Sequence, residues 1–372
     1  MNNADTLVVV SRRFTGYGTP VVVGDVLYVL ANEGLDDEFV RALDVKDGKQ
    51  VWSTRIGKVG SLDQKPSYPG SRSAPAVDGD LLYVFGSDGD VACLEIATGK
   101  IRWNLNVRIK FGGQPGRWGY SESPLVDGDL LVCAPGGEEA TLVALNKMNG
   151  DVVWKTSVPG GDKAAYASTI IAMAAGTKQY VQFLGKGLVG VDAANGNVLW
   201  QYAKTAQGSP ANIGTPLTDN GYIYSASSRG GGSLIQIKSD GDAIAVEEIY
   251  YSPKLPRAVG GALLIDGYLY GTTGSVIQCV DFLSGEIKWS DRAVGAGSFC
   301  YLDGRLYVHG EEGEVLLVSP SPEAYEEKGR FKAPKSPDAG ESKAWAYPVV
   351  SNGRLYIRDF GILSCYDVKK KD

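Results

Sequence analysis

Short apolar runs separated by turn-forming dipeptides recur along the whole chain. Each copy has apolar residues, then Asp-Gly, Asn-Gly or a similar pair, and then an alternating run that usually ends in Tyr. Such dipeptides supply the positive φ of a tight hairpin. The copies contain Gly24, Gly79, Gly128, Gly176, Gly221, Gly267, Gly304 and Gly353. Their spacing predicts an array of small sheets, none of which can bury its faces alone.

A second motif alternates with these hairpins. It begins with a small residue, and an acidic or amide residue follows two positions later. Gly comes four positions after that residue, and Trp comes four positions after Gly. The acidic or amide side chain can close an Asx-type turn, and Trp can bury a large flat area against the next sheet. The matching copies end at Trp52, Trp103, Trp154, Trp200 and Trp289. The gap between the last two predicts one degenerate repeat.

Together the two motifs predict four strands per repeat. The fold class is therefore all-β, an eight-bladed β-propeller of four-stranded blades, forming a single domain over residues 1–372. The last repeat ends soon after Cys365–Asp367, before a fourth strand. We expect the apolar run Thr6–Arg13 to complete that blade and close the ring, which removes an open sheet edge. An open β-solenoid is the alternative, but four strands per unit fit it poorly.

Charge and hydropathy narrow the classes of partner. The formal net charge is −6, and the only basic run is Lys369–Lys371, so a nucleic-acid partner is disfavoured. No apolar run is long enough to span a membrane. The first five residues are polar and do not form a secretory signal. We expect a monomer, located in the periplasm or secreted after a leader absent from this chain.

The cysteines and the single histidine predict neither a metal site nor a catalytic residue. Cys93, Cys279 and Cys365 occupy the small-residue position of the second motif, as expected for buried core thiols. No Cys-x-x-Cys spacing is present. His309, the only histidine, lies in a predicted strand, which excludes a multi-histidine metal site. The acidic residues of the motif are interpreted as turn formers.

Candidate ligand-binding residues lie in the links that run from one blade to the next. In a propeller these links converge at the mouth of the central channel, where binding sites are usually found. Aromatic, Arg, Glu and Asn side chains there could stack on and hydrogen-bond a sugar, or anchor a peptide. The candidates are Tyr68, Arg72, Trp118, Tyr120, Glu122, Tyr166, Asn212, Arg257 and Trp345. Packing onto the propeller mouth is the alternative for each residue, whereas for the set we favour binding.

The motifs also carry a family resemblance. The pattern Ala42 to Trp52 resembles the tryptophan-docking motif of propellers related to pyrroloquinoline quinone (PQQ) dehydrogenases. The chain as a whole is similar to PQQ-like repeat proteins, including the BamB-like outer-membrane assembly propellers and planctomycete-type secreted proteins. Tyr68–Ser73, Phe111–Gly116 and Gly185–Asp192 resemble the planctomycete-type group.

Two function classes follow from this resemblance. The first, which we favour, is a non-catalytic extracytoplasmic binding or scaffold propeller that holds a protein partner or a polar or glycan ligand at the channel mouth. The alternative is a PQQ-dependent alcohol or sugar dehydrogenase, whose family members carry adjacent cysteines over the quinone and a Ca²⁺ site. No two cysteines are adjacent here and no N-terminal lipobox cysteine is seen. We therefore predict no cofactor, and PQQ with Ca²⁺ is disfavoured.

Overall fold

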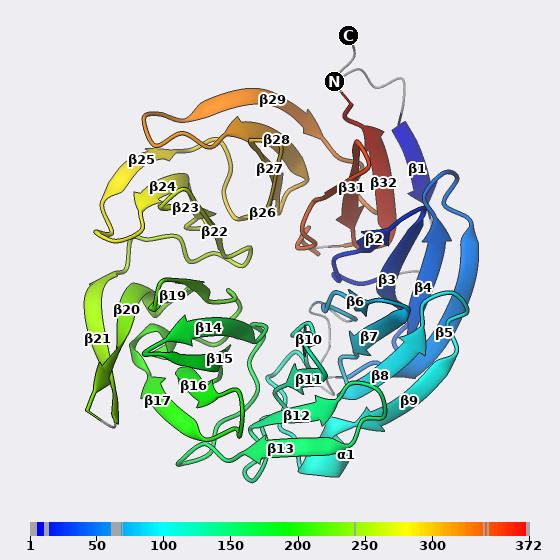
Figure 1. The fold of residues 1–372 in the computed structure, drawn as a ribbon. Helices are drawn as coiled ribbons and strands as arrows, with labels where there is room; N and C mark the ends of the chain where they lie inside the picture. Colours follow the sequence, from blue (N-terminus) through cyan, green and yellow to red (C-terminus); the bar gives the residue numbers. More distant parts are fainter. Residues whose placement is uncertain are drawn as a thin grey trace.

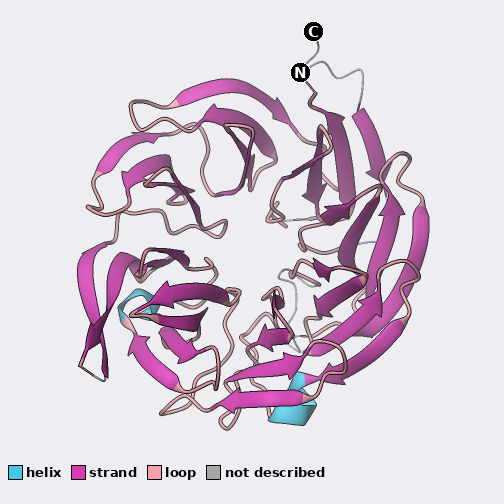
Figure 2. Cartoon of the chain, viewed as in Figure 1, coloured by secondary structure: helices cyan, strands magenta, loops and turns pink. Residues whose placement is uncertain are grey.

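The computed structural model describes residues 6–10, 15–60, 68, 70–241, 243–337, 339, 340 and 342–369. Within them, eight four-stranded antiparallel sheets surround one axis (Figure 1), which confirms the predicted eight-bladed β-propeller. Among the described residues, helix is confined to two short segments (Figure 2), α1 (Val107–Phe111) and η2 (Lys204–Ala206). No helix in this described part is long and apolar enough to cross a bilayer.

Blades 1 to 4 take their strands in sequence order. Blade 1 contains β2 (Val21–Val23), β3 (Val26–Glu33), β4 (Asp37–Asp44) and β5 (Gln50–Lys58). Blade 2 contains β6 (Ala76–Asp78), β7 (Leu81–Phe85), β8 (Asp90–Glu95) and β9 (Ile101–Asn106). Blade 3 contains β10 (Leu125–Asp127), β11 (Leu130–Cys133), β12 (Leu142–Asn146) and β13 (Val152–Thr156). Blade 4 contains β14 (Ile170–Ala174), β15 (Thr177–Phe183), β16 (Leu188–Asp192) and β17 (Val198–Tyr202).

Blades 5 to 8 continue the ring. Blade 5 contains β18 (Leu217–Asp219), β19 (Tyr222–Ser227), β20 (Gly231–Asp240) and β21 (Ala243–Ser252). Blade 6 contains β22 (Ala262–Ile265), β23 (Tyr268–Thr272), β24 (Ile277–Asp281) and β25 (Ile287–Asp291). Blade 7 contains β26 (Gly297–Leu302), β27 (Arg305–Gly310), β28 (Glu314–Ser319) and β29 (Glu326–Lys332). Blade 8 contains β30 (Val349–Ser351), β31 (Arg354–Asp359), β32 (Ile362–Asp367) and β1 (Thr6–Val10).

The ring is closed by the N-terminal strand, as predicted. β1 pairs antiparallel with β32, and its register places Leu7 opposite Cys365. The first and the last strand of the chain therefore lie side by side in blade 8 (Figure 1). This pairing covers the outer edge that the last repeat would otherwise leave open.

Tryptophan docking joins successive blades at the outer turns. The Trp103 indole N–H donates to the Lys147 carbonyl oxygen of the next blade at 2.9 Å. A Cβ built on Gly150 would approach the Trp103 ring to 2.8 Å, so only glycine leaves room for the indole. In blade 5, the degenerate repeat, Tyr250 takes the place of Trp, and its hydroxyl donates to the Phe282 carbonyl oxygen at 2.9 Å.

The blade 4 to blade 5 seam departs from this pattern. The Trp200 indole N–H donates to Gln179 of its own blade at 2.6 Å. Its ring occupies the space above Gly190, where a Cβ would lie 2.2 Å from the indole. At this seam the tryptophan therefore packs on the small residue of its own sheet.

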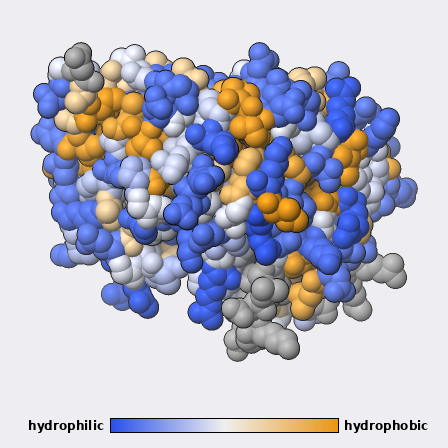
Figure 3. All heavy atoms as spheres, turned by 90° about the horizontal axis from the view of Figure 1, so that it is seen from below, coloured by the Kyte–Doolittle hydropathy of each residue, from blue (hydrophilic) through white to orange (hydrophobic). Residues whose placement is uncertain are grey.

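The buried residues lie between neighbouring blades and form separate clusters around the ring. Cys93, Cys133, Cys279 and Cys365 are buried and free, as expected for core thiols, and Cys300 is free and half-buried. Apolar and polar side chains are interspersed along the rim of the ring (Figure 3).

Strand polarity gives the propeller two different ends. Because neighbouring strands are antiparallel, the links between blades share one end with the loops that join second to third strands. We call this end the link face. The first-to-second and third-to-fourth turns form the opposite end, the turn face. The tryptophan-docking motifs belong to the turn face, and the candidate residues belong to the link face.

Candidate functional site

Five of the predicted site residues form one continuous series of contacts on the link face. Trp345 lies beside Tyr68 with ring centroids 4.6 Å apart. The Arg72 guanidinium donates to the Tyr68 carbonyl and, at 2.8 Å, to the Trp118 carbonyl. The Trp118 ring lies 5.8 Å from the ring of Tyr166. We call this series the link arc, since it joins links from four different blade junctions.

Tyr17, which the sequence reasoning missed, connects the arc across the ring closure. Its ring lies 5.0 Å from Trp345 and 6.4 Å from Tyr68. The Arg72 guanidinium lies over the same ring, 5.5 Å from its centroid. The only available signal was a tyrosine between two glycines, Gly16 and Gly18, in the link that follows the N-terminal strand.

Arg72 acts within the arc as a cross-link between main chains. Besides its bonds to the Tyr68 and Trp118 carbonyls, it donates to the Gly70 carbonyl at 3.0 Å. Burial lowers the pKa of its guanidinium, while nearby Tyr17 and Tyr166 oppose that shift. Most of its hydrogen-bonding capacity is therefore directed at the protein itself.

Tyr120 and Glu122 lie beneath the link face. Tyr120, a candidate for stacking on a ligand, is only 1 % exposed and offers no accessible ring face. Its ring stacks on Phe85 with centroids 4.9 Å apart, and its hydroxyl donates to the Pro135 carbonyl at 2.8 Å. Packing against a large apolar neighbour buries it, and an isolated link sequence does not reveal that neighbour.

Glu122 is a buried carboxylate without a cationic partner among the described residues. One oxygen accepts from the Ala134 N–H at 2.6 Å, and the other accepts from Gln182 at 3.4 Å. Burial raises its pKa to about 8, although the Ala134 N–H favours the ionised form. Glu38 has a similar environment, because burial raises its pKa to about 7 while Ser87 donates to both of its oxygens.

The last two candidates lie farther along the ring. Asn212 is buried, and its amide donates to the Leu184 and Gly185 carbonyls at 2.7 and 3.2 Å. Its main chain joins the arc, because the Tyr166 N–H donates to the Asn212 carbonyl at 3.0 Å. Arg257 is separate from the arc and lines a cavity of about 10 Å³, roughly the space of one water.

The side chain two residues after the hairpin tyrosine can also hydrogen-bond the main chain of a neighbouring blade or link. After Tyr356, the Arg358 guanidinium donates to the Gly18 and Leu30 carbonyls at 2.6 and 2.8 Å. Burial lowers the pKa of Arg358 to about 9. After Tyr307, His309 donates to the Ala346 carbonyl at 3.2 Å, and burial lowers its pKa to about 4. The regular offset from each tyrosine was the signal that could have revealed these contacts.

The arrangement does not fit PQQ with Ca²⁺. Among the described residues, no group of three or more His, Cys, Asp or Glu side chains could hold a metal ion. Glu122 and Asn212, the carboxylate and the amide near the mouth, are buried and already bonded to main-chain groups. A Ca²⁺ ion takes six to eight oxygen ligands, so these two side chains supply too few.

Comparison with known proteins identifies the family. The family model described as outer membrane protein assembly factor BamB matches residues 3–116 and 36–291, which cover blades 1 to 6. The chain belongs to this family. That membership agrees with the resemblance of the repeat motifs.

Curated relatives and a solved structure agree with this assignment. BamB of Bordetella pertussis is 22% identical over 332 residues, which are 81% of this chain and 77% of the relative. BamB of Burkholderia pseudomallei is 30% identical over 177 residues, but that alignment spans only 38% of this chain and 42% of the relative. The crystal structure of BamB from Moraxella catarrhalis superimposes with a TM-score of 0.66 and 16% identity, covering 99% of each chain. At that identity the superposition shows the shared fold alone.

One relative that is an enzyme matches a smaller part of this chain than the Bordetella relative does. The quinohemoprotein alcohol dehydrogenase of Comamonas testosteroni is 27% identical over 168 residues. These residues are 43% of this chain and 22% of the enzyme. The sequence match therefore lies in a shared repeat region. The crystal structure of the same enzyme superimposes over 100% of this chain and 79% of the enzyme, with a TM-score of 0.66 and 14% identity, which shows the shared fold alone.

Proposed function

We propose that the chain is a non-catalytic, extracytoplasmic scaffold that binds a protein partner through its link face. The relatives named as outer membrane protein assembly factors support this class of function and a periplasmic location. The proposed binding residues are the aromatic side chains of the arc that are not fully buried, Tyr68, Trp118 and Trp345. Tyr120, Glu122 and Asn212 then act by supporting the links from below.

The link arc is the observation that carries this proposal. Rings and main-chain hydrogen bonds join links of successive blades into one connected surface. A surface held in one arrangement loses little conformational entropy when it binds, and partly exposed Trp and Tyr are the usual anchors of protein interfaces. The same arrangement leaves few polar groups free for catalysis, because Arg72 and Glu122 bond to main-chain groups.

Site-specific photo-crosslinking in the intact host cell tests the proposal. A photoreactive residue at Arg117 or Lys254 lies exposed on the link face, and one at Met173 or Leu283 lies exposed on the turn face. We expect a discrete protein adduct from the link-face positions and none from the turn-face positions. Trp118→Ala should remove the adduct formed at Lys254 while the protein stays folded. Equal adducts from both faces would overturn the proposal.

A further inference from the structure

A cavity of about 400 Å³ opens on the link face at the seam between blades 3 and 4. Its volume lies in the range of small-molecule sites. The lining comes from the links entering blades 3 and 4 and from the second-to-third-strand loops of the same blades. No residue of the link arc lines it.

One wall of this cavity is held by internal hydrogen bonds. The Asp162 carboxylate accepts from the main-chain N–H groups of Lys163 and Lys186 at 2.8 and 2.9 Å. The Lys186 ammonium donates to the Gly160 and Gly161 carbonyls at 2.7 and 2.6 Å. The charges of Asp162 and Lys186 are thus directed into the wall, which fixes the link against the neighbouring loop.

Glycines make much of the remaining surface. Gly136, Gly160, Gly161 and Gly185 all line the cavity. A Cβ built on Gly160 or Gly161 would contact nothing within 4 Å, so these two main-chain positions face open space. Without side chains, main-chain N–H and C=O groups can be approached closely by a ligand. Such backbone surfaces capture peptide termini in other recognition sites.

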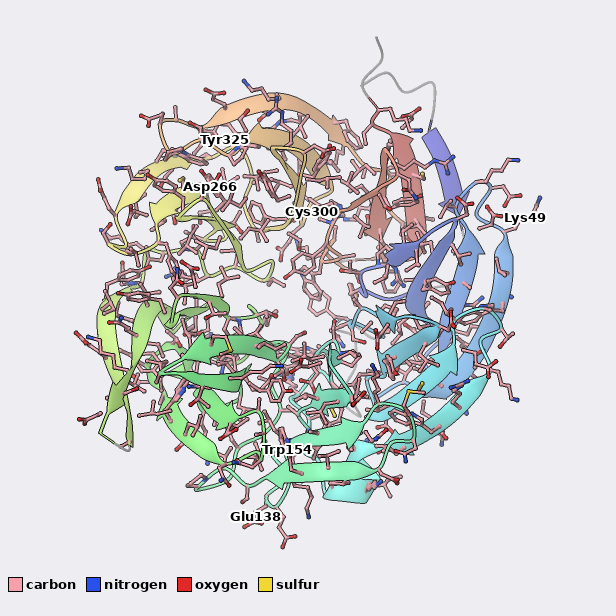
Figure 4. The ribbon with its side chains drawn as sticks, in the orientation of Figure 1. Lys49, Glu138, Trp154, Asp266, Cys300 and Tyr325 are labelled. Atoms are coloured by element: carbon pink, nitrogen blue, oxygen red, sulfur yellow. The ribbon has the colours of Figure 1, made fainter. Side chains whose placement is uncertain are left out.

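Two oppositely charged side chains that line this cavity are available to bind a ligand. Glu138 lies in the β11–β12 loop, at the outer margin of the ring (Figure 4), and Lys163 lies in the link between blades 3 and 4. Both are exposed. Across the residues that the structure describes, neither charged group has an ion-pair or hydrogen-bond partner. Gln114 also lines the cavity, and within the described part of the chain its side-chain amide has no hydrogen-bond partner.

We propose that this cavity binds a short free peptide in its zwitterionic form. The peptide ammonium faces Glu138, its carboxylate faces Lys163, and Gln114 hydrogen-bonds an amide between them. Both terminal charges must enter one cavity, so the ligand is a free peptide of a few residues and not the terminus of a folded protein. This site goes beyond the proposed function, because it shares no residue with the arc.

Calorimetric titration of the full chain with matched tripeptides tests the site. The probes are triglycine, N-acetyl-triglycine and triglycinamide, which carry both terminal charges, only the carboxylate and only the ammonium. We expect the wild type to prefer triglycine over each blocked form by about threefold to fivefold, as for exposed ion pairs. Glu138→Gln should abolish only the preference for the free ammonium. Lys163→Met should abolish only the preference for the free carboxylate.

Glu139→Gln provides the matched control, since Glu139 is also exposed and next in sequence but does not line the cavity. It should keep both preferences. Equal affinity for the three tripeptides, or no binding at millimolar concentrations, would overturn the proposal. So would binding of a neutral disaccharide that displaces triglycine, because the site would then recognise hydroxyl groups. Loss of the link-face crosslinks with tripeptide binding intact would contradict only the scaffold function.

Discussion

The turn face and the link face differ in the contacts that join neighbouring blades. On the turn face, the same contact recurs at several seams, as when Trp52 and Trp289 each donate to a carbonyl of the following blade at 3.1 and 2.8 Å. On the link face, one hydrogen bond also repeats, from a main-chain N–H of one link to a Ser or Thr hydroxyl of the next, as from Ser123 to Ser168 at 2.9 Å. The other fastenings differ between junctions, with Arg72 at one and His309 at another. Repeated contacts therefore assemble the ring, and the side chains of the link face that do not repeat are free to acquire a function.

The largest expected effect comes from breaking a turn-face contact. Trp154 is 8 % exposed, and its indole N–H donates to the Ala193 carbonyl of the next blade at 3.3 Å (Figure 4). Trp154→Ala should lower the free energy of unfolding by about 3–5 kcal/mol, because a large buried aromatic is lost. Chemical denaturation measures this loss. A cost below about 1 kcal/mol would show that docking does not hold neighbouring blades together.

The pH dependence of stability probes the buried carboxyl groups of the link face. Glu122 has a folded pKa of about 8, above its ordinary 4.5. A raised pKa adds stability that is complete below about pH 4.5 and is lost as the pH rises through 8. Between pH 5 and pH 8 the free energy of unfolding should fall by about 2–4 kcal/mol. Urea unfolding at the two pH values measures it.

Glu122→Gln should flatten this pH profile, and Glu139→Gln, at an exposed position, should leave it unchanged. A residual slope is expected from Glu38, whose pKa of about 7 has the same sign. Stability that rises between pH 5 and pH 8 would mean that Glu122 is held as a carboxylate by the Ala134 N–H.

A smaller effect on stability distinguishes a link-face residue that supports the fold from one that contacts the partner. Tyr120→Phe keeps the stacking on Phe85 and removes the hydroxyl that donates to Pro135. We expect a loss of about 1 kcal/mol, since the Pro135 carbonyl loses one hydrogen bond but still accepts from the Gln114 N–H at 2.9 Å. Thermal unfolding should report this loss while crosslinking from Lys254 persists. Loss of crosslinking without loss of stability would make Tyr120 a direct contact.

The smallest expected stability change is at Trp118. Its ring is only half-buried and contacts Tyr166 across a blade junction. Trp118→Ala should cost about 1 kcal/mol of stability or less, yet remove partner binding at the link face. Paired unfolding and crosslinking measurements test both parts. A stability cost as large as that of Trp154→Ala would show that Trp118 serves packing alone.

The difference between the faces also explains what the sequence could predict. The hairpin dipeptides and the Trp offsets act over short separations and repeat, so blade number, strand number and closure by the N-terminal strand were all predictable. The contacts of the link arc join residues far apart in sequence, such as Tyr17 and Trp345, and the side chains that make them differ from junction to junction. Burial of Tyr120 depends on Phe85 in the preceding repeat, which composition does not show.

The candidate residues lie in the links, as the sequence indicated, but the burial of Tyr120, Glu122 and Asn212 was not predicted. Aromatic and arginine residues in long links predicted the arc, because such links must converge at the mouth. The seam cavity was missed, since its glycines and single charges resemble ordinary turn residues. A role in ligand binding remains a prediction for every residue of the arc.

The central claim is that this link face binds without catalysing a reaction. Calorimetric titration of the full chain with PQQ and Ca²⁺, followed by dye-linked oxidation of small alcohols and sugars, tests it most directly. The buried, internally bonded Glu122 and Asn212 predict no heat of binding and no turnover. Micromolar binding of PQQ with Ca²⁺-dependent turnover would contradict the claim and make the chain a dehydrogenase.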